Sequence, residues 1–299
     1  MPYNNPRYNI NKSDNVTELV RDLAGTEYVS GVSSHKLGLN LIISKMFEMK
    51  MLKQGDLILH PIKTYQSTLA TLCNNGLNVS YLDTVKNTFA MDVNAVKDAK
   101  AIFVPMVYGN FPDINRLKEL NIPLIFTDGY FGGMWDNENV FKYADFACID
   151  FKYINENLTQ AAVIGKHQIP QNGIMGDKWL FKMLPDINDK RKKTFQRLQK
   201  LFGKYWKKFE TPMRVSDKAD PIWQRYPLYC KDINVYWEFR LWLEACKMNV
   251  TADVTQYANL RENCPNAQRE RGILEIPIPL FETPIDEDIF IHLLENFLV

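Results

Sequence analysis

Polar side chains follow several short apolar runs of this sequence, at positions where a ligand could be bound. Asp128 comes just after the apolar run 124–126, separated from it by Thr127, at the end of a predicted strand. Ligands of an open α/β sheet bind outside the carboxyl ends of its strands, so Asp128 could contact one. The alternative is an ordinary turn or helix-capping aspartate, which is a common event. Four loops are expected at this edge: residues 31–35, 60–65, 127–133 and 150–160.

The four histidines and five cysteines show no metal-binding spacing. His35 and His60 fall in two of the four loops and could touch a ligand, although a structural histidine is the commoner outcome. The cysteines are scattered without a Cys-x-x-Cys pair, which favours free thiols in a reducing compartment over zinc or disulfides. The sequence also lacks a nucleophile–histidine–acid arrangement, a Walker loop and a Gly-x-Gly-x-x-Gly motif.

The hydrophobic pattern predicts the helices and strands that carry these residues. Residues 35–52 carry apolar side chains at helical spacing. Short apolar runs separated by helical segments predict a mostly parallel sheet covered on both faces. A basic amphipathic helix is expected over 186–208 and a final helix over about 285–298. We therefore predict a large α/β domain at 1–185 and a smaller α+β domain at 186–299. The strand runs are residues 57–59, 79–82, 101–104, 123–126 and 146–149.

The charge balance excludes several classes of partner. The chain has 299 residues, of which 46% are hydrophobic, so it can bury a substantial core. Lys and Arg total 36 against 35 Asp and Glu, a net charge of +1, which gives no support for a nucleic-acid or membrane-surface partner. The N-terminus is polar and no apolar stretch approaches the length of a membrane span. A cytoplasmic protein is expected.

Several short motifs, in this order, resemble those of the DegT/StrS family of nucleotide-sugar aminotransferases. Residues 33–35 (Ser-Ser-His) resemble the family's Ser-Gly-Thr turn, and residues 53–61 resemble its Gly-Asp-Glu-Val-Ile-x-Pro segment. Residues 64–65 (Thr-Tyr) fall where the family has Thr-Phe. Residues 104–109 resemble Pro-Val-His-x-Tyr-Gly, residues 127–129 resemble Glu-Asp-Ala, and residues 264–277 resemble the stretch before the last helix. The likeness is strongest across residues 31–165.

The resemblance implies the fold of a type-I aminotransferase, whose cofactor is pyridoxal phosphate. In such enzymes the cofactor ring stacks on the aromatic residue after the threonine, here Tyr65. A carboxylate, here Asp128, pairs with the pyridine nitrogen and keeps it protonated, so that the ring can accept electrons. Both of these positions are chemically intact in this sequence.

The lysine that forms the Schiff base in the family is not found. Counted from Phe151, its position holds Asn155, and counted back from residues 158–159 it holds Glu156. Neither side chain carries the amine nucleophile that a Schiff base requires. The family's Gly-Glu-Gly-Gly turn is also missing. Lys152, close by in the sequence, is the candidate that could replace the lost amine, although a surface lysine is the commoner interpretation; Lys63 is a weaker candidate.

The expected phosphate site is altered as well. The family's Gly-Thr turn offers backbone N–H groups and a hydroxyl at a helix N-terminus, whereas Ser33 and Ser34 keep hydroxyls without the glycine. The family's phosphate-binding serine aligns with Asp150. A carboxylate about 4 Å from a phosphate would repel it by roughly 4 kcal/mol per charge pair at an effective dielectric of about 20. These changes predict that pyridoxal phosphate is bound weakly or not at all.

The retained and altered cofactor residues are consistent with two hypotheses on function. The first, which we favour, is a homologue without ordinary transaminase activity, acting as a degenerate binding or partner subunit in sugar or polysaccharide biosynthesis. The second is an active pyridoxal-phosphate-dependent aminotransferase or dehydratase on a nucleotide-linked keto-sugar, because some relatives dispense with the lysine for dehydration. Either reading predicts a homodimer with a nucleotide-sugar ligand.

Overall fold

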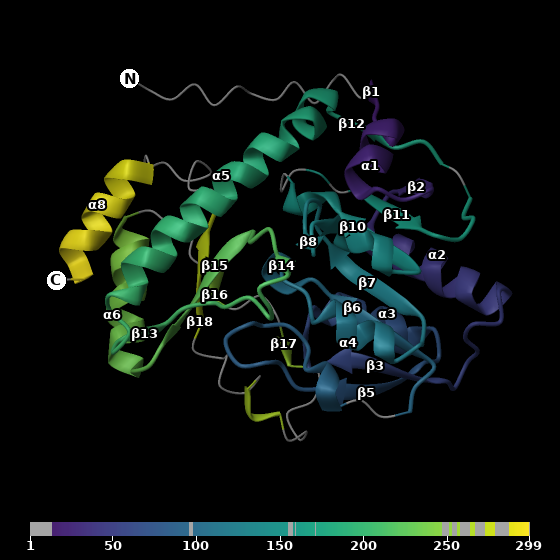
Figure 1. Ribbon diagram of the computed structural model, residues 1–299, viewed down its shortest axis with the longest axis horizontal. Helices are drawn as coiled ribbons and strands as arrows, with labels where there is room; N and C mark the ends of the chain where they lie inside the picture. Colours follow the sequence, from purple (N-terminus) through teal and green to yellow (C-terminus); the bar gives the residue numbers. More distant parts are fainter. Residues whose placement is uncertain are drawn as a thin grey trace.

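The computed structural model describes residues 14–95, 98–154, 158, 160–170, 172–246, 251–252, 256–257, 264–266, 273–278 and 287–298. A seven-stranded sheet forms one side of the molecule, and a smaller four-stranded sheet with two helices forms the other (Figure 1). The helices are α1 (Thr17–Ala24), α2 (His35–Glu48), α3 (Gln66–Asn74), α4 (Ile114–Glu119), α5 (Lys178–Gly203), α6 (Ile233–Ala245) and α8 (Glu287–Leu298). Short 3₁₀ turns cover Val93–Ala95, Val107–Gly109, Val140–Tyr143 and Phe151–Tyr153.

The large sheet has the strand order β2-β11-β10-β7-β6-β3-β5. Strands β10, β7, β6, β3 and β5 pair in parallel, and β11 pairs antiparallel with β10 and with β2. The expectation of a mostly parallel α/β sheet is confirmed. Its strands are β2 (Tyr28–Val32), β3 (Leu57–Pro61), β5 (Asn78–Leu82), β6 (Ala101–Pro105), β7 (Leu124–Gly129), β10 (Phe146–Asp150) and β11 (Ala161–Gly165).

Both faces of this sheet are buried, as the continuous apolar strands require. Alternate residues of each strand enter different cores: Phe103 lies in one and Val104 in the other. One core packs under α2 and α3, and the other includes α1, α4 and the first turns of α5. Parallel strands covered on both faces present their carboxyl ends, with the loops that follow them, at a single edge.

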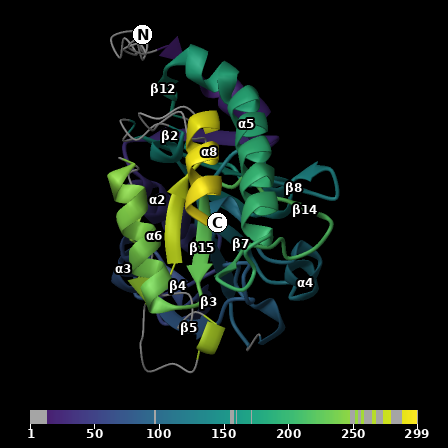
Figure 2. The same ribbon diagram turned by 90° about the vertical axis from the view of Figure 1, so that its left-hand side faces the viewer.

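The second region contains a four-stranded sheet with the order β13-β15-β18-β16. Figure 2 shows α6, α8 and α5 around it, and all three helices share one aromatic-rich core with its strands. The strands are β13 (Phe209–Glu210), β15 (Arg225–Cys230), β16 (Thr251–Ala252) and β18 (Ile273–Pro277). Two-residue strands make the remaining pairings: β1 (Asp14–Asn15), β4 (Lys63–Thr64), β8 (Met134–Trp135), β9 (Glu138–Asn139), β12 (Met175–Gly176), β14 (Ala219–Asp220) and β17 (Gln256–Tyr257).

Helix α5 joins the two regions and corrects the predicted start at residue 186. It begins at Lys178, where the side chain of Asp177 accepts hydrogen bonds from two backbone N–H groups of the first turn. Pro185 lies inside the helix and removes one backbone donor. Leu184 and neighbouring apolar residues pack into the large-sheet core on this part of the helix, and that burial offsets the loss. The predicted division at 185/186 therefore falls within α5, and the domain division stays a prediction.

Helix α2 is also shorter than the expected range of 35–52. It ends at Glu48, and Lys50 adopts a left-handed backbone with φ of 58°. Ser34 caps its first turn, because the hydroxyl accepts the N–H of Leu37 at 3.3 Å. His35 is thus the first residue of α2, which begins at the edge of the large sheet where the sequence predicts a ligand.

Candidate functional site

The four loops expected at the carboxyl edge contact one another in two pairs. The side chain of His35, from the first loop, reaches Asp128 in the third. The ammonium of Lys152, from the fourth loop, lies 5.9 Å from the ring centroid of Tyr65, at the end of the second. Residues far apart in the sequence are therefore brought together by the strand order β10-β7-β6-β3.

Asp128 lies at the centre of the first group of contacts. It is near the end of β7, only 2% exposed, with a left-handed backbone whose φ is 54°. Such a conformation is uncommon outside glycine, and aspartate and asparagine tolerate it better than most residues. Its Oδ2 accepts a hydrogen bond of 3.0 Å from the hydroxyl of Thr68, on the first turn of α3. A buried carboxylate needs such partners, because its desolvation is otherwise costly.

His35 covers the other side of that carboxylate. Its Nε2 lies 3.5 Å from Asp128 Oδ1 and accepts the backbone N–H of Asp128 at 3.3 Å. The backbone contact uses the lone pair of Nε2, so in that arrangement the ring proton is on Nδ1. The His35 side chain is 8% exposed, whereas Thr68 is fully buried behind the carboxylate. The imidazole is therefore the outer of the two groups that hold Asp128.

His60, by contrast, is a structural histidine. Its Nδ1–H donates to the carbonyl of Phe103 at 2.8 Å, and its Nε2 accepts the hydroxyl of Thr64 at 2.8 Å. Burial lowers the pKa of His60 to about 4, so the ring is neutral at pH 7. The two ring nitrogens link His60, on β3, to Phe103 on β6 and to Thr64 on β4. Neither nitrogen is therefore available to a ligand.

Asp150 lies at the end of the neighbouring strand β10. Its carboxylate caps the 3₁₀ turn that follows, accepting the N–H of Lys152 at 3.0 Å, and its Oδ2 lies 3.0 Å from the Lys152 Nζ. Asp150 is almost fully buried, while the Lys152 side chain is 48% exposed. Lys152, the candidate replacement amine, is thus held near the surface and above the ring of Tyr65. The group that holds it is the carboxylate of Asp150, which aligns with the family's phosphate-binding serine.

The pKa of the buried Cys148 thiol is affected by the charges of both carboxylates, Asp128 and Asp150. Its Sγ points to the carbonyl of His35 at 3.6 Å. Burial raises its pKa well above the ordinary value, and the charges of Asp128 and Asp150 raise it further. The thiol therefore stays protonated at neutral pH, and it is a poor nucleophile.

A second buried polar group, which the sequence did not predict as a unit, connects the two regions. The hydroxyl of Tyr108 donates to Glu275 Oε1 at 2.7 Å, and Arg225 Nε lies 3.6 Å from Oε2 of the same carboxylate. The ammonium of Lys63, fully buried, lies 5.4 Å from the centroid of the Tyr108 ring and 5.0 Å from that of Phe89. No sequence spacing signals this arrangement, because Glu275 is 167 residues from Tyr108.

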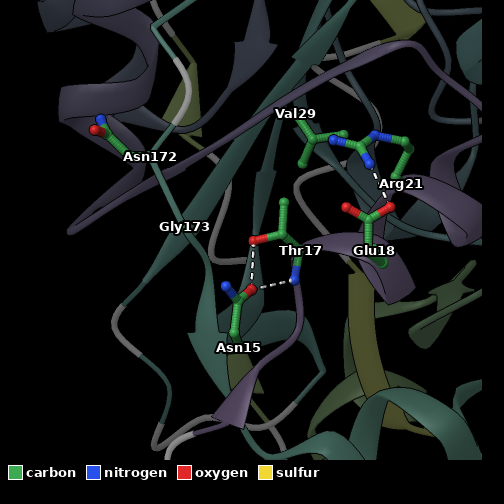
Figure 3. A pocket seen from close by; sticks show the side chains of 7 residues that line it. All are labelled: Asn15, Thr17, Glu18, Arg21, Val29, Asn172 and Gly173. Carbon is green, nitrogen blue, oxygen red and sulfur yellow. Dashed lines mark hydrogen bonds and ion pairs between the residues drawn. The ribbon is translucent and has the colours of Figure 1, made fainter.

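A pocket of about 310 Å³ lies elsewhere, against α1 and strand β2 at the edge of the sheet (Figure 3). Its charged lining groups, Arg21 and Glu18, form an ion pair with each other. The side chain of Asn15 accepts hydrogen bonds from the N–H and the hydroxyl of Thr17. Because these groups are mutually paired, we assign no chemistry to this pocket.

The predicted cofactor residues are arranged unfavourably for pyridoxal phosphate. The carboxylate meant for the pyridine nitrogen is covered by His35 and Thr68. The position meant for the phosphate holds the Asp150 carboxylate, and Ser34 uses its hydroxyl to cap α2, while Ser33 is exposed. Asn155 and Glu156, at the expected lysine position, lie outside the described residues. As arranged here, the residues do not fit the cofactor, and we derive no step through it.

Across the described residues, no cluster of three or more His, Cys, Asp or Glu side chains could hold a metal ion. Within that same part of the chain, none of the helices combines the length and apolar character needed to cross a membrane.

Comparison with known proteins agrees with this architecture. Residues 9–155 match the model of the DegT/DnrJ/EryC1/StrS aminotransferase family. A curated relative, GDP-4-keto-6-deoxy-D-mannose 3-dehydratase of Escherichia coli O55:H7, is 33% identical over 103 residues. That alignment spans 31% of this chain and 26% of the relative's length. The family resemblance predicted from the sequence is confirmed by these matches.

Solved structures show the same fold over nearly the whole chain. An E. coli GDP-4-keto-6-deoxy-D-mannose-3-dehydratase with bound hydrated PLP superposes with a TM-score of 0.79 at 16% identity, covering 95% of this chain and 90% of that one. S. venezuelae DesV, in complex with a ketimine intermediate, gives a TM-score of 0.77 at 15% identity, covering 94% and 87%. The predicted type-I aminotransferase-like fold is confirmed.

Proposed function

We propose that this relative of the DegT/DnrJ/EryC1/StrS aminotransferases is a non-transaminating homologue that binds a nucleotide-linked sugar in sugar or polysaccharide biosynthesis. One observation carries the proposal. Asp128, the carboxylate through which the family would engage its cofactor, is held by His35 and Thr68 and is 2% exposed. Asn155 and Glu156, neither of which has an amine, stand where the Schiff-base lysine is expected.

The chain's own residues support binding better than amino transfer. The ammonium of Lys152 is paired with Asp150 and its side chain is 48% exposed, so it is only partly desolvated. A catalytic amine must be activated by a lowered pKa and held in a near-attack geometry. The carboxylate of Asp150 instead holds Lys152 beside Tyr65, where both side chains could contact a bound ligand.

The class of ligand comes from the relatives. The curated relative is named for a GDP-linked keto-sugar, and the family model covers the residues that carry His35, Tyr65 and Asp128. A nucleotide-linked sugar is therefore the ligand class that we propose for the carboxyl edge of the large sheet. We also propose that the protein forms a homodimer, is located in the cytoplasm and acts as partner to an active subunit.

Thermal unfolding of the full-length chain tests the proposal. A panel of GDP-, UDP- and dTDP-linked sugars is added, with the free nucleotides and free sugars as controls. A ligand that binds the folded state raises the unfolding temperature in a concentration-dependent way. We expect one nucleotide class to do so, and no transfer of an amino group from glutamate to a keto-sugar. Stabilisation by none of the sugars, or measurable amino transfer, contradicts the proposal.

A second candidate function is a pyridoxal-phosphate-dependent aminotransferase or dehydratase on a nucleotide-linked keto-sugar. The observation in its favour is the 33% identity with a 3-dehydratase over 103 residues of the chain. This candidate requires His35 to leave Asp128. Release of water from the keto-sugar, dependent on added cofactor and lost in Asp128→Asn, would establish it in place of the first proposal.

A further inference from the structure

The imidazole of His35 and the carboxylate of Asp128 form a buried pair, and the proposed function depends on this pair. Its parts come from separate elements, α2 and β7. A ring nitrogen of His35 faces Asp128 Oδ1 at 3.5 Å and accepts the Asp128 N–H at 3.3 Å. In shape and chemistry this is a heteroaromatic nitrogen presented to a carboxylate. The imidazole thus lies beside the carboxylate with Nε2 as an acceptor of the backbone N–H, whereas a protonated pyridine nitrogen in its place would donate to the carboxylate.

The accessibility of the groups around Asp128 decides which one a ligand would have to displace. The carboxylate is 2% exposed, so an incoming ring must move a neighbour. Thr68 is fully buried and contributes from the interior side of α3. His35 is 8% exposed and extends from a helix start whose neighbours Ser33 and Lys36 are exposed. Of these two neighbours of Asp128, the imidazole is therefore the more accessible to solvent.

We propose that His35 is an internal occupant of the ring-binding place on Asp128, and that it sets whether this site admits a heteroaromatic base such as a pyridine or an imidazole. The inference rests on the proposed function, and it explains why cofactor binding would be weak even where Asp128 and Tyr65 are retained. The strained backbone at Asp128, with φ of 54°, aims both its N–H and its carboxylate at the same imidazole.

Removal of the ring should leave a cavity lined on one side by a carboxylate. Large-to-small substitutions in packed regions leave space that collapses only in part. Such cavities accept small rings of matching shape. Here the carboxylate would add a charge-assisted hydrogen bond to a protonated ring nitrogen, worth about 1.5–3 kcal/mol, or about tenfold to a hundredfold in affinity.

The test compares full-length wild type with His35→Ala. Two probes are titrated separately: imidazole, followed by thermal unfolding, and pyridoxal phosphate, followed by its absorbance and by equilibrium dialysis. We expect His35→Ala to bind each probe at least about tenfold more tightly than wild type. The double variant His35→Ala/Asp128→Asn should lose the gain, because asparagine tolerates the backbone but lacks the negative charge.

A matched control is available on the same sheet. His167 also has Nε2 at 3.5 Å from a carboxylate, that of Asp145, but both side chains are partly exposed. His167→Ala removes an imidazole from a carboxylate without opening the carboxyl edge, so it should gain no probe binding. Where His35→Ala fails to fold, His35→Thr, with the family's residue type at that position, is measured in its place.

Each outcome decides the inference separately from the proposed function. Folded His35→Ala and His35→Thr chains that bind the probes no better than wild type overturn the inference, as does an equal gain in His167→Ala. Wild type that already binds pyridoxal phosphate as tightly as His35→Ala overturns it too. Neither measurement uses a nucleotide sugar or an amino donor, so failure of the proposed function would appear in its own assays.

Discussion

Two buried histidines, 25 positions apart in the sequence, have opposite relations to the scaffold around them. His60 gives both ring nitrogens to its own framework, one to the carbonyl of Phe103 and one to Thr64. His35 gives one nitrogen to the single residue Asp128 and lies closer to solvent. The first links strands of the core, and we propose that the second covers a ligand-binding residue. Burial alone therefore does not distinguish these two histidines, but their hydrogen-bond partners do.

The largest expected effect is a difference in stability between the alanine variants of His60 and His35. His60→Ala should lower the free energy of unfolding by about 3–5 kcal/mol, because it leaves a cavity and two unpaired polar groups in the core. His35→Ala should cost about 1–2 kcal/mol, because its single partner residue can be reached by water. Urea unfolding of both variants measures the difference. Equal losses would remove the distinction between the two histidines.

The pH dependence of the unfolding free energy gives a second test of the structural role of His60. The pKa of His60 falls from about 6.5 in the unfolded chain to about 4 in the folded protein. Its stabilising contribution is therefore complete above pH 6.5 and is lost as the pH falls toward 4, by about 3 kcal/mol in total. Unfolding of wild type and His60→Gln from pH 7.5 to 4 measures it. A variant as acid-sensitive as wild type would show that His60 is not the group responsible.

Two threonines give a matched pair of smaller effects. The hydroxyl of Thr68 donates to the carboxylate of Asp128, and that of Thr64 donates to the neutral ring of His60. Hydrogen bonds to charged groups are the stronger, so Thr68→Val should cost about 2 kcal/mol and Thr64→Val about 1 kcal/mol. Denaturant midpoints of the two variants, at matched slopes, test the order. The reverse order would indicate that Asp128 is not charged in the folded protein.

The smallest effect is expected at Lys152. Its side chain is about half exposed, and its pair with Asp150 should contribute no more than about 0.5 kcal/mol. Lys152→Met and the control Lys142→Met, whose side chain is 50% exposed and paired with Glu138, should be nearly as stable as wild type. Thermal unfolding at low and high salt checks both. A large loss for Lys152 alone would point to a role beyond a surface ion pair.

Much of the fold could be predicted from the sequence because hydrophobic periodicity reports burial. The five apolar runs all lie in parallel strands of the large sheet, and the long helix was expected close to its position. Its early turns were missed because Pro185 interrupts the helical pattern, while burial of Leu184 and its neighbours stabilises the helix across it. Strands β2 and β11 were not predicted, since β11 carries a short run with two small residues, Ala161 and Ala162.

The candidate site was predicted as a set of loops and not as a set of contacts. Asp128, Tyr65, Asp150 and Lys152 do meet other predicted residues at the carboxyl edge. The contact between His35 and Asp128 could not be read from spacing, because it depends on where α2 begins and on the left-handed backbone at Asp128. Thr68 was missed for a similar reason: a threonine on the first turn of a helix carries no signal of the partner across the sheet.

The most direct test of the central claim is an absorbance titration of the full-length wild-type chain with pyridoxal phosphate, before and after borohydride. The account predicts no saturable change in the cofactor spectrum at concentrations up to the millimolar range and no borohydride-fixed product. Saturable binding with a band that borohydride removes, and that Lys152→Met abolishes, would contradict it.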